Sequence, residues 1–270
     1  MVDLLKQNSY GLPDLIREHA LERGKPLRRL RAPDGCPWDR EQTHESMRAN
    51  LLEEAYEVAE AIDEGSVEHL KEELGDVLLQ VVFHASIEED AGHFDLNDVA
   101  DGVCRKLIYR HPHVFGDVTV HSTGEILSNW EELKKKEKGQ ATQADALDAV
   151  ARSLPALWRA EKMQKKAAKA GFDWPDVSGA MDKLDEEVQE LHEAVESGEG
   201  VEEELGDVLF AAVKAARFAG VDPEAAIAAT CEKFIRRYRA VEEGAAAMGR
   251  SVDQLPLETL EALWVEAKGS

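Results

Sequence analysis

The sequence is poor in cysteine and contains no long apolar run. Its three cysteines, Cys36, Cys104 and Cys231, lie far apart and form no C-x-x-C pair, so we expect free thiols in a reducing cytosol and no disulfide framework. No stretch approaches the roughly 18 consecutive apolar residues of a membrane-spanning helix, and the N-terminus lacks the basic and apolar regions of a signal peptide. The sequence therefore predicts a cytoplasmic protein without a membrane partner.

Basic residues are also scarce relative to acidic ones. The 270 residues include 32 Lys and Arg but 55 Asp and Glu, which gives a formal net charge of −23. This balance argues against binding to nucleic acids or anionic membranes, because both need a basic surface. An anionic small molecule can still bind, provided that metal ions or a few Lys and Arg screen the local negative charge.

Alternating patterns typical of strands are nearly absent, and the sequence predicts an all-α fold. Residues 113–120 are the one weak strand candidate, and a loop fits them equally well. Elsewhere apolar residues recur at i, i+3, i+4 and i+7, the spacing of one helix face. We expect helices near residues 12–30, 43–63, 66–90, 95–111, 123–138, 155–170, 178–197, 200–219, 222–249 and 256–268.

An acidic pattern of the form E-x-x-E, a gap and then E-x-x-D occurs twice. The first copy consists of Glu54, Glu57, Glu73 and Asp76, and the second of Glu187, Glu190, Glu204 and Asp207. Tryptophans precede both copies, and Lys-x-x-x-Arg follows both, in the same order. Such order is typical of a duplicated helical unit. We predict an N-terminal domain over residues 1–140, a linker over 141–152 and a C-terminal domain over 153–270.

The repeated carboxylates suggest a metal site. Residues three apart share one helix face, so two neighbouring helices would each direct two carboxylates at one point. Crowded carboxylates repel each other unless a cation lies among them, and hard oxygen ligands suit Mg²⁺ or Mn²⁺. The alternative is a solvated acidic face. Mid-helix glycines in each E-x-x-D, Gly75 and Gly206, favour the metal site, because glycine there costs stability but permits close approach to the backbone.

Basic residues near the second acidic pattern are candidates for phosphate binding. Lys233 and Arg237 are one helical turn apart, and Lys183 lies one turn before Glu187. They can bind phosphate oxygens, or they can form ordinary surface ion pairs with nearby Glu. The first repeat has Lys106 and Arg110 but carries Asn50 in place of the early Lys. Trp264 can stack on a nucleotide base or belong to the core.

The sequence also resembles the MazG family of bacterial nucleoside triphosphate pyrophosphohydrolases. The resemblance covers nearly the whole chain and includes the runs RLRAPDGCPWDREQTH, NLLEEAYEVAEAI, EELGDVLLQVVFHA and EEELGDVLFAAVKAAR. It implies two tandem MazG-type domains built like four-helix bundles, a homodimer, and Mg²⁺-dependent cleavage between the α- and β-phosphates. It also implies that the second repeat supplies the main metal ligands, Glu187, Glu190, Glu204 and Asp207, and the nucleotide contacts, Lys183, Lys233, Arg237 and Trp264.

One departure from the family pattern and one difference between the repeats affect the predicted phosphate contacts. Gly200 lies where the family can carry a Lys, and Asn50 replaces the early Lys in the first repeat. The first repeat is therefore expected to bind metal through Glu54, Glu57, Glu73 and Asp76, with Lys106 and Arg110 nearby, but to turn over poorly or prefer another nucleotide.

Our functional hypothesis is the hydrolysis of a broad range of ribo- and deoxyribonucleoside triphosphates to monophosphate and pyrophosphate. Glu186 or Glu187 would orient or deprotonate the attacking water, with Mg²⁺ as cofactor and Mn²⁺ as a substitute. Two narrower enzymes remain alternatives, a dimeric dUTPase and a phosphoribosyl-ATP pyrophosphohydrolase. A third alternative, from another class, is a non-catalytic helical adaptor with an acidic face.

Overall fold

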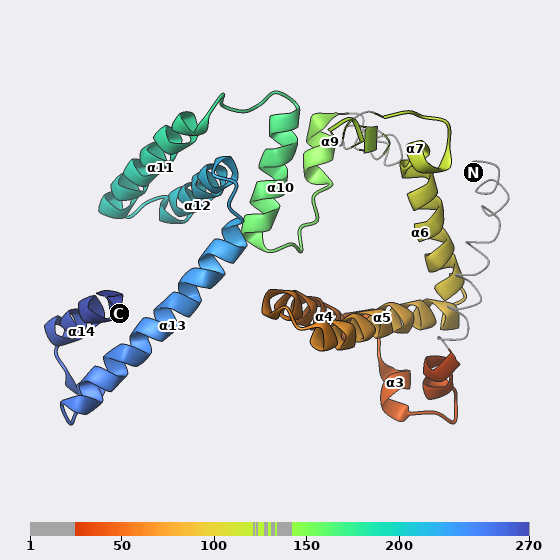
Figure 1. The fold of residues 1–270 in the computed structure, drawn as a ribbon, viewed down its shortest axis with the longest axis horizontal. Coiled ribbons are helices and arrows are strands. Elements are labelled where there is room, and N and C mark those ends of the chain that lie inside the picture. Colours follow the sequence, from red (N-terminus) through yellow and green to blue (C-terminus); the bar gives the residue numbers. More distant parts are fainter. Residues whose placement is uncertain are drawn as a thin grey trace. The chain divides into compact units, whose positions relative to one another are not determined.

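The computed structural model describes residues 25–120, 122, 124–126, 129–130, 133 and 142–269. Over these ranges every regular element is a helix, so the predicted all-α fold is confirmed. The expected helix at 12–30 and that at 123–138 lie largely outside the described residues. The chain divides into two units, Met1–Lys134 and Lys135–Ser270, and each is described separately below (Figure 1).

The first unit is organised around a helical hairpin. Helix α4 (His44–Glu64) and helix α5 (Val67–Asp90) pack against each other, with α3 (Pro37–Glu41) before them and α6 (Leu96–Arg110) and α7 (Pro112–Phe115) after them. The turn between α4 and α5 is as short as the sequence suggests. Gly65 ends α4 in the left-handed conformation, at φ 67°, and the Ser66 side chain accepts a hydrogen bond from the His69 backbone N–H to cap α5.

The core of the first unit lies between this hairpin and the segment that precedes α3. Its buried members are Leu27, Met47, Val82 and Phe83, and Ile87 and Leu96 pack against them. The weak strand candidate at residues 113–120 is not a strand. Pro112–Phe115 forms α7, whose first position suits proline, and the residues that follow are irregular.

The second unit contains a corresponding hairpin. Helix α11 (Val177–Ser197) packs against α12 (Val201–Phe218), and α10 (Ala156–Lys169) lies against α12. Helix α13 (Pro223–Ala247) contacts α10 and α12. After the short 3₁₀ helix η1 (Val252–Gln254), α14 (Leu257–Gly269) packs against the C-terminal half of α13. Helix α9 (Gln143–Asp148) falls inside the predicted linker and packs on α10.

The repeated acidic patterns lie on equivalent elements of the two units. E-x-x-E is on α4 and α11, and E-x-x-D is on α5 and α12. A two-helix hairpin with a short turn places each pair of patterns side by side. Throughout the described ranges, no helix combines the length and apolar character needed to cross a membrane.

Candidate active site

Carboxylates from α11 and α12 converge in the second unit. Glu187, Glu204 and Asp207 each offer an oxygen atom within 4.8 Å of the other two. Glu187 is only 7% exposed, and charged side chains are rarely buried to this extent. Glu190 belongs to the same group, because a hydrogen bond with Glu187 and then desolvation raise the pKa of Glu190 above its ordinary value.

The donor set fits a hard divalent cation. Four carboxylates lie together, and each that is ionised repels the others in a partly buried place. Oxygen ligands of this kind are those that Mg²⁺ and Mn²⁺ take, whereas Zn²⁺ sites generally include nitrogen or sulfur. The residues that would hold such an ion are Glu187, Glu190, Glu204 and Asp207.

The first unit contains an equivalent carboxylate group. Glu54, Glu57 and Glu73 bring their oxygens within 4.8 Å of one another. Burial raises the pKa of Glu54, and the negative charges of Asp76 and Glu57 raise it further. Asp76 therefore lies near this group. Here the Gln80 side-chain amide lies 3.4 Å from Glu54 Oε1 as a donor. The duplication therefore reproduces the acidic site, with a neutral amide among its neighbours in the first unit.

Lys183 lies directly beside the second cluster. Its Nζ is 2.7 Å from Glu187 Oε1 and 2.8 Å from Glu186 Oε1, and these hydrogen bonds raise the pKa of Lys183. The two glutamates differ in environment. Glu187 belongs to the carboxylate cluster, whereas the Glu186 side chain is 56% exposed. The sequence placed Lys183 one turn before Glu187, and the structure has it in that position.

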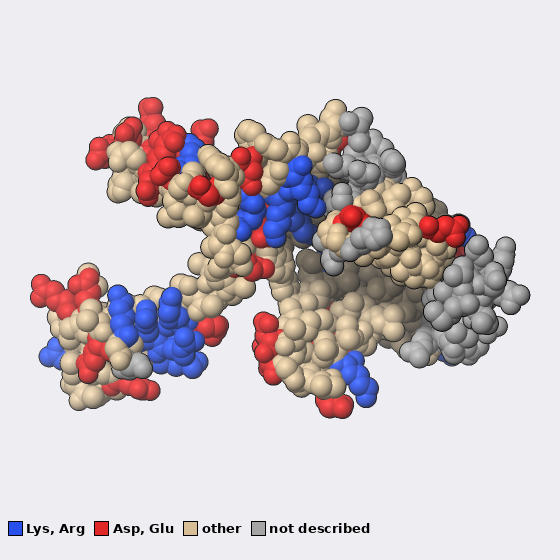
Figure 2. Space-filling view, turned by 45° about the horizontal axis from the view of Figure 1, so that its top comes forward, with Lys and Arg blue, Asp and Glu red and all other residues tan. Residues whose placement is uncertain are grey.

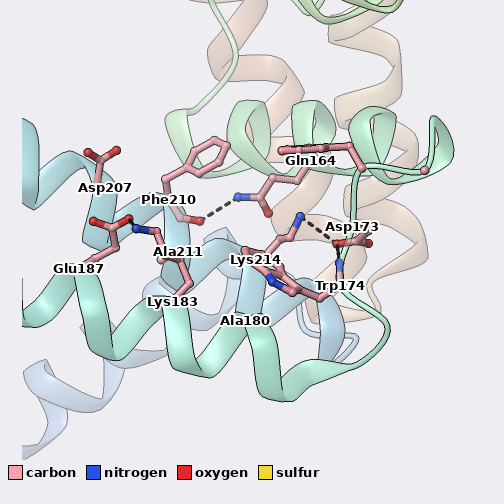
Figure 3. A pocket seen from close by; sticks show the side chains of 12 residues that line it. Gln164, Asp173, Trp174, Ala180, Lys183, Glu187, Asp207, Phe210, Ala211 and Lys214 are labelled. Carbon is pink, nitrogen blue, oxygen red and sulfur yellow. Dashed lines mark hydrogen bonds and ion pairs between the residues drawn. The ribbon is translucent and has the colours of Figure 1, made fainter.

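A pocket of about 400 Å³ opens next to these carboxylates (Figure 3). Its volume falls within the usual range of small-molecule sites. Glu187, Asp207 and Lys183 lie at one end, while the other end is largely apolar and aromatic. Asp173, Trp174 and Lys214 lie toward this second end, and Gln164 and Phe210 lie between the two ends (Figure 3).

The pocket wall contains an ion-pair network that the sequence analysis did not identify. Asp173 lies 2.9 Å from Lys214 Nζ and accepts two hydrogen bonds from one Arg217 nitrogen, at 2.6 and 2.7 Å. All three side chains are largely buried. The run LFAAVKAAR carried a signal for this network, because a Lys in an otherwise apolar helix face needs a partner.

The pocket is lined by residues that differ in size or polarity from their counterparts in the first repeat. The two repeats can be aligned by pairing Glu187 with Glu54 on the first helix and Asp207 with Asp76 on the second. In this alignment, three pocket-lining positions have larger or apolar counterparts in the first unit. Those counterparts are buried, two of them in its core. The pairs are Ala180 with Met47, Ala211 with Gln80, and Lys214 with Phe83.

The remaining predicted nucleotide contacts lie on the α13–α14 surface. The Arg237 guanidinium is 5.9 Å from the centre of the Trp264 ring, and Phe234 packs against that ring at 5.1 Å. Considering only the described residues, neither Lys233 nor Arg237 forms an ion pair with the carboxylate cluster. Figure 2 shows acidic side chains gathered over α11–α12 and a separate group of basic side chains on α13.

The first repeat has the same pairing of arginine and tryptophan. Arg110 lies over Trp130 at 5.9 Å, the distance found for Arg237 and Trp264. Lys106 is on the same helix, α6, and is exposed. The two repeats therefore share a cation–π contact between an arginine and a tryptophan.

Comparison with known proteins gives the chain its family. The sequence model described as "MazG nucleotide pyrophosphohydrolase domain" matches residues 42–115 and 177–242. The chain belongs to the MazG family. The two matched segments contain all eight predicted metal ligands, Lys183, Lys233 and Arg237. Trp264 and the pocket residues Gln164, Asp173 and Trp174 lie outside them.

Relatives extend this similarity over most of the chain. The protein of Thermotoga maritima named "Nucleoside triphosphate pyrophosphohydrolase/pyrophosphatase MazG" is 46% identical over 243 residues, 90% of this chain and 93% of that protein. The Escherichia coli K12 "Nucleoside triphosphate pyrophosphohydrolase" is 44% identical over 247 residues, 90% of this chain and 94% of that protein. The Bacillus subtilis "Uncharacterized protein YabN" is 48% identical over 245 residues, 90% of this chain but 50% of that protein.

Asp173 should contribute to the stability of this MazG-family protein in a pH-dependent way. Burial alone would raise the pKa of Asp173, but hydrogen bonds from Lys214 and Arg217 outweigh it and lower the pKa below 3.8. A lowered carboxyl pKa stabilises the folded state above the unfolded pKa, and this contribution is lost as the pH falls through the folded pKa. Asp173→Asn should cost about 1–2 kcal/mol near pH 7, because Lys214 and Arg217 lose their charged partner at a site that solvent partly screens.

Urea unfolding followed by circular dichroism checks this prediction at several pH values. The difference between wild type and Asp173→Asn should shrink as the pH falls below 3.8. Asp148→Asn is a matched control, because Asp148 pairs with Arg152 at 3.2 Å on an exposed surface, where such pairs contribute little. Equal effects of the two substitutions at pH 7 would contradict the prediction.

Proposed function

We propose that this protein hydrolyses nucleoside triphosphates between the α- and β-phosphates, releasing a nucleoside monophosphate and pyrophosphate. The observation that carries the proposal is the cluster of Glu187, Glu204 and Asp207 beside Lys183, at one end of a pocket of about 400 Å³. The names of its relatives from T. maritima and E. coli support the same reaction. We propose a broad range of ribo- and deoxyribonucleotide substrates, Mg²⁺ as the cofactor and Mn²⁺ as a substitute.

Each group in the cluster has a proposed role. Glu187, Glu190, Glu204 and Asp207 would hold Mg²⁺, which when bound neutralises triphosphate charge and polarises the phosphorus. The Lys183 ammonium would exchange its carboxylate partners for phosphate oxygens. Because Glu187 lies within the ligand group and Glu186 lies beside it, we propose that Glu186 orients or deprotonates the attacking water.

The basic residues on α13 fit this scheme if the protein forms a homodimer. Large apolar side chains are exposed on α12 and α13, among them Leu205, Leu209, Phe234 and Ile235, and such surfaces mark interfaces between proteins. The surface of α12 is also open at Gly206, because a Cβ added there would meet no atom of another helix within 4 Å. In the proposed dimer, the basic α13 surface carrying Lys233 and Arg237 would face an acidic cluster. Lys233, Arg237 and Trp264 would then contact the nucleotide.

The three cysteines support a cytoplasmic location. All are free thiols, and Cys231 is exposed, which fits a reducing compartment.

Product analysis with purified full-length protein tests the reaction and its metal requirement. Each ribo- and deoxyribonucleoside triphosphate should give monophosphate and pyrophosphate with Mg²⁺, and chelation should abolish both products. Glu187→Gln and Asp207→Asn should each lower kcat/KM by roughly 100-fold or more, because each removes a ligand charge. Glu202→Gln, on the exposed side of α12, is the control and should retain activity.

Three outcomes would count against the proposal. Release of diphosphate and orthophosphate would indicate another phosphohydrolase reaction. Wild-type rates in Glu187→Gln, with helicity unchanged, would remove the cluster from the reaction. Inertness toward every triphosphate, without stabilisation by Mg²⁺, would favour an acidic adaptor.

The two repeats should differ in their contribution to turnover. Glu54→Gln should lower kcat/KM by no more than about twofold, because the first repeat has Asn50 and Gln80 where the second has Lys183 and Ala211. The same steady-state assay on Glu54→Gln and Glu187→Gln compares the repeats directly. A larger loss in Glu54→Gln would assign the main activity to the first unit.

Sedimentation equilibrium tests the proposed dimer. The mass should be twice the 29.9 kDa of one chain. A mass of one chain at micromolar concentration would contradict the dimer and leave the basic α13 surface without its proposed place in the site.

A further inference from the structure

The pocket wall beyond the carboxylates contains a buried polar atom without a partner. Gln164 is 3% exposed, and its side-chain nitrogen donates to the Phe210 backbone carbonyl at 2.8 Å. Because a carbonyl only accepts, this bond fixes which side of the amide is nitrogen. The other side, Oε1, is buried, has no hydrogen-bond partner and lies toward the interior of the pocket (Figure 3).

An acceptor in this position indicates a ligand with a donor group. Buried polar atoms are nearly always paired, and leaving one unpaired costs free energy. The Gln164 oxygen lies on the wall of a pocket that holds the carboxylates and Lys183 at one end. With a divalent cation held among those carboxylates, as proposed above, that end binds an anionic group. A molecule that reaches from there to Gln164 therefore has an anionic part and a part that donates a hydrogen bond.

The surroundings of Gln164 favour a flat ring as the donor-bearing part. The indole of Trp174 and the ring of Phe210 line the pocket on either side of it. The Trp174 ring is held in place, since Lys214 Nζ lies 5.0 Å from its centre and a Cβ on Gly179 would come within 2.3 Å of it. Flat, π-rich rings gain most from such walls.

We propose that this part of the pocket binds the base of the nucleotide and that Gln164 Oε1 accepts a hydrogen bond from it. The Lys214 ammonium, which has three donors, would serve an adjacent acceptor on the base while still paired with Asp173. Adenine, cytosine, guanine and uracil all present a donor beside an acceptor on their pairing edge. One acceptor and one donor therefore bind every common base, which fits a broad substrate range. This inference rests on the proposed function.

The first repeat supports assigning this role to the second unit alone. There Met47 and Phe83, at the positions of Ala180 and Lys214, are buried in the core. The first unit therefore has large apolar side chains where the second unit has Ala180, which lines the pocket, and the Lys214 donor. Among the described residues, the carboxylates are duplicated but the residues of this base site are not.

The test compares two substrates that differ only at the proposed hydrogen bond. Purine riboside 5′-triphosphate is ATP with the 6-amino group replaced by hydrogen, so it lacks the donor. The wild-type protein should show a kcat/KM for ATP about tenfold higher than for this analogue, because a site built to pair a donor discriminates against its absence. In Gln164→Met the ratio of the two kcat/KM values should fall to about one, mainly because kcat/KM for ATP decreases.

Gln143→Met is the matched control. Gln143 also donates its side-chain amide to a backbone carbonyl, that of Lys166 at 2.7 Å, but it does not line the pocket. It should lose similar stability in thermal unfolding while keeping the tenfold ratio.

The outcomes separate this inference from the proposed function. A wild-type ratio near one, or a tenfold ratio retained in Gln164→Met, would overturn the base assignment while leaving α–β cleavage intact. If Gln164→Met fails to fold, inosine 5′-triphosphate decides, because its N1–H restores a donor. The wild-type kcat/KM for it should match that for ATP, and a value as low as for the purine riboside analogue would overturn the inference. Absence of pyrophosphate from every triphosphate would overturn the proposed function itself, and this inference with it.

Discussion

Repulsion among carboxylates is the constraint on which the active region depends. Glu187 is buried next to Glu190, Glu204 and Asp207, and Lys183 is the nearby cation that offsets their charge. Desolvating several like charges is unfavourable, so the α11–α12 hairpin must hold them together through its own packing. The short turn from Ser197 to Val201 and the contact of α10 with α12 provide that support. A divalent cation would convert the repulsion into attraction, which links folding of this region to its ligand.

Much of the fold could be predicted from the sequence because local signals agree with the global structure. Gly65, Ser66 and Asp222-Pro223 end or begin helices close to the ends of the expected ranges 43–63, 66–90 and 222–249. Helical periodicity and the repeated carboxylates placed the two hairpins within a residue or two of their observed bounds. Residues 113–120 resisted assignment, because a proline start and a short apolar run fit both a turn of helix and a strand.

The candidate site was predictable only in part. Spacing along one helix predicted that Glu187 and Lys183 would share a face, and the Glu-rich patterns predicted the clusters. The base site of the pocket could not be predicted, because it depends on contacts between elements far apart in sequence, such as Gln164 with the Phe210 carbonyl. The placement of Lys233 and Arg237 likewise depends on the course of α13, which no local pattern encodes.

Gly179 shows how a residue that touches no ligand can set the size of a binding site. It lies near the start of α11, where glycine weakens a helix, and the Trp174 indole packs directly over it. Any larger side chain would push the indole toward the cavity and shorten the space available to a bound ring. Relatives that differ at this one position could therefore accept different ligands while keeping every contacting residue the same. In this architecture, a residue that packs behind the pocket wall can therefore alter the substrate range.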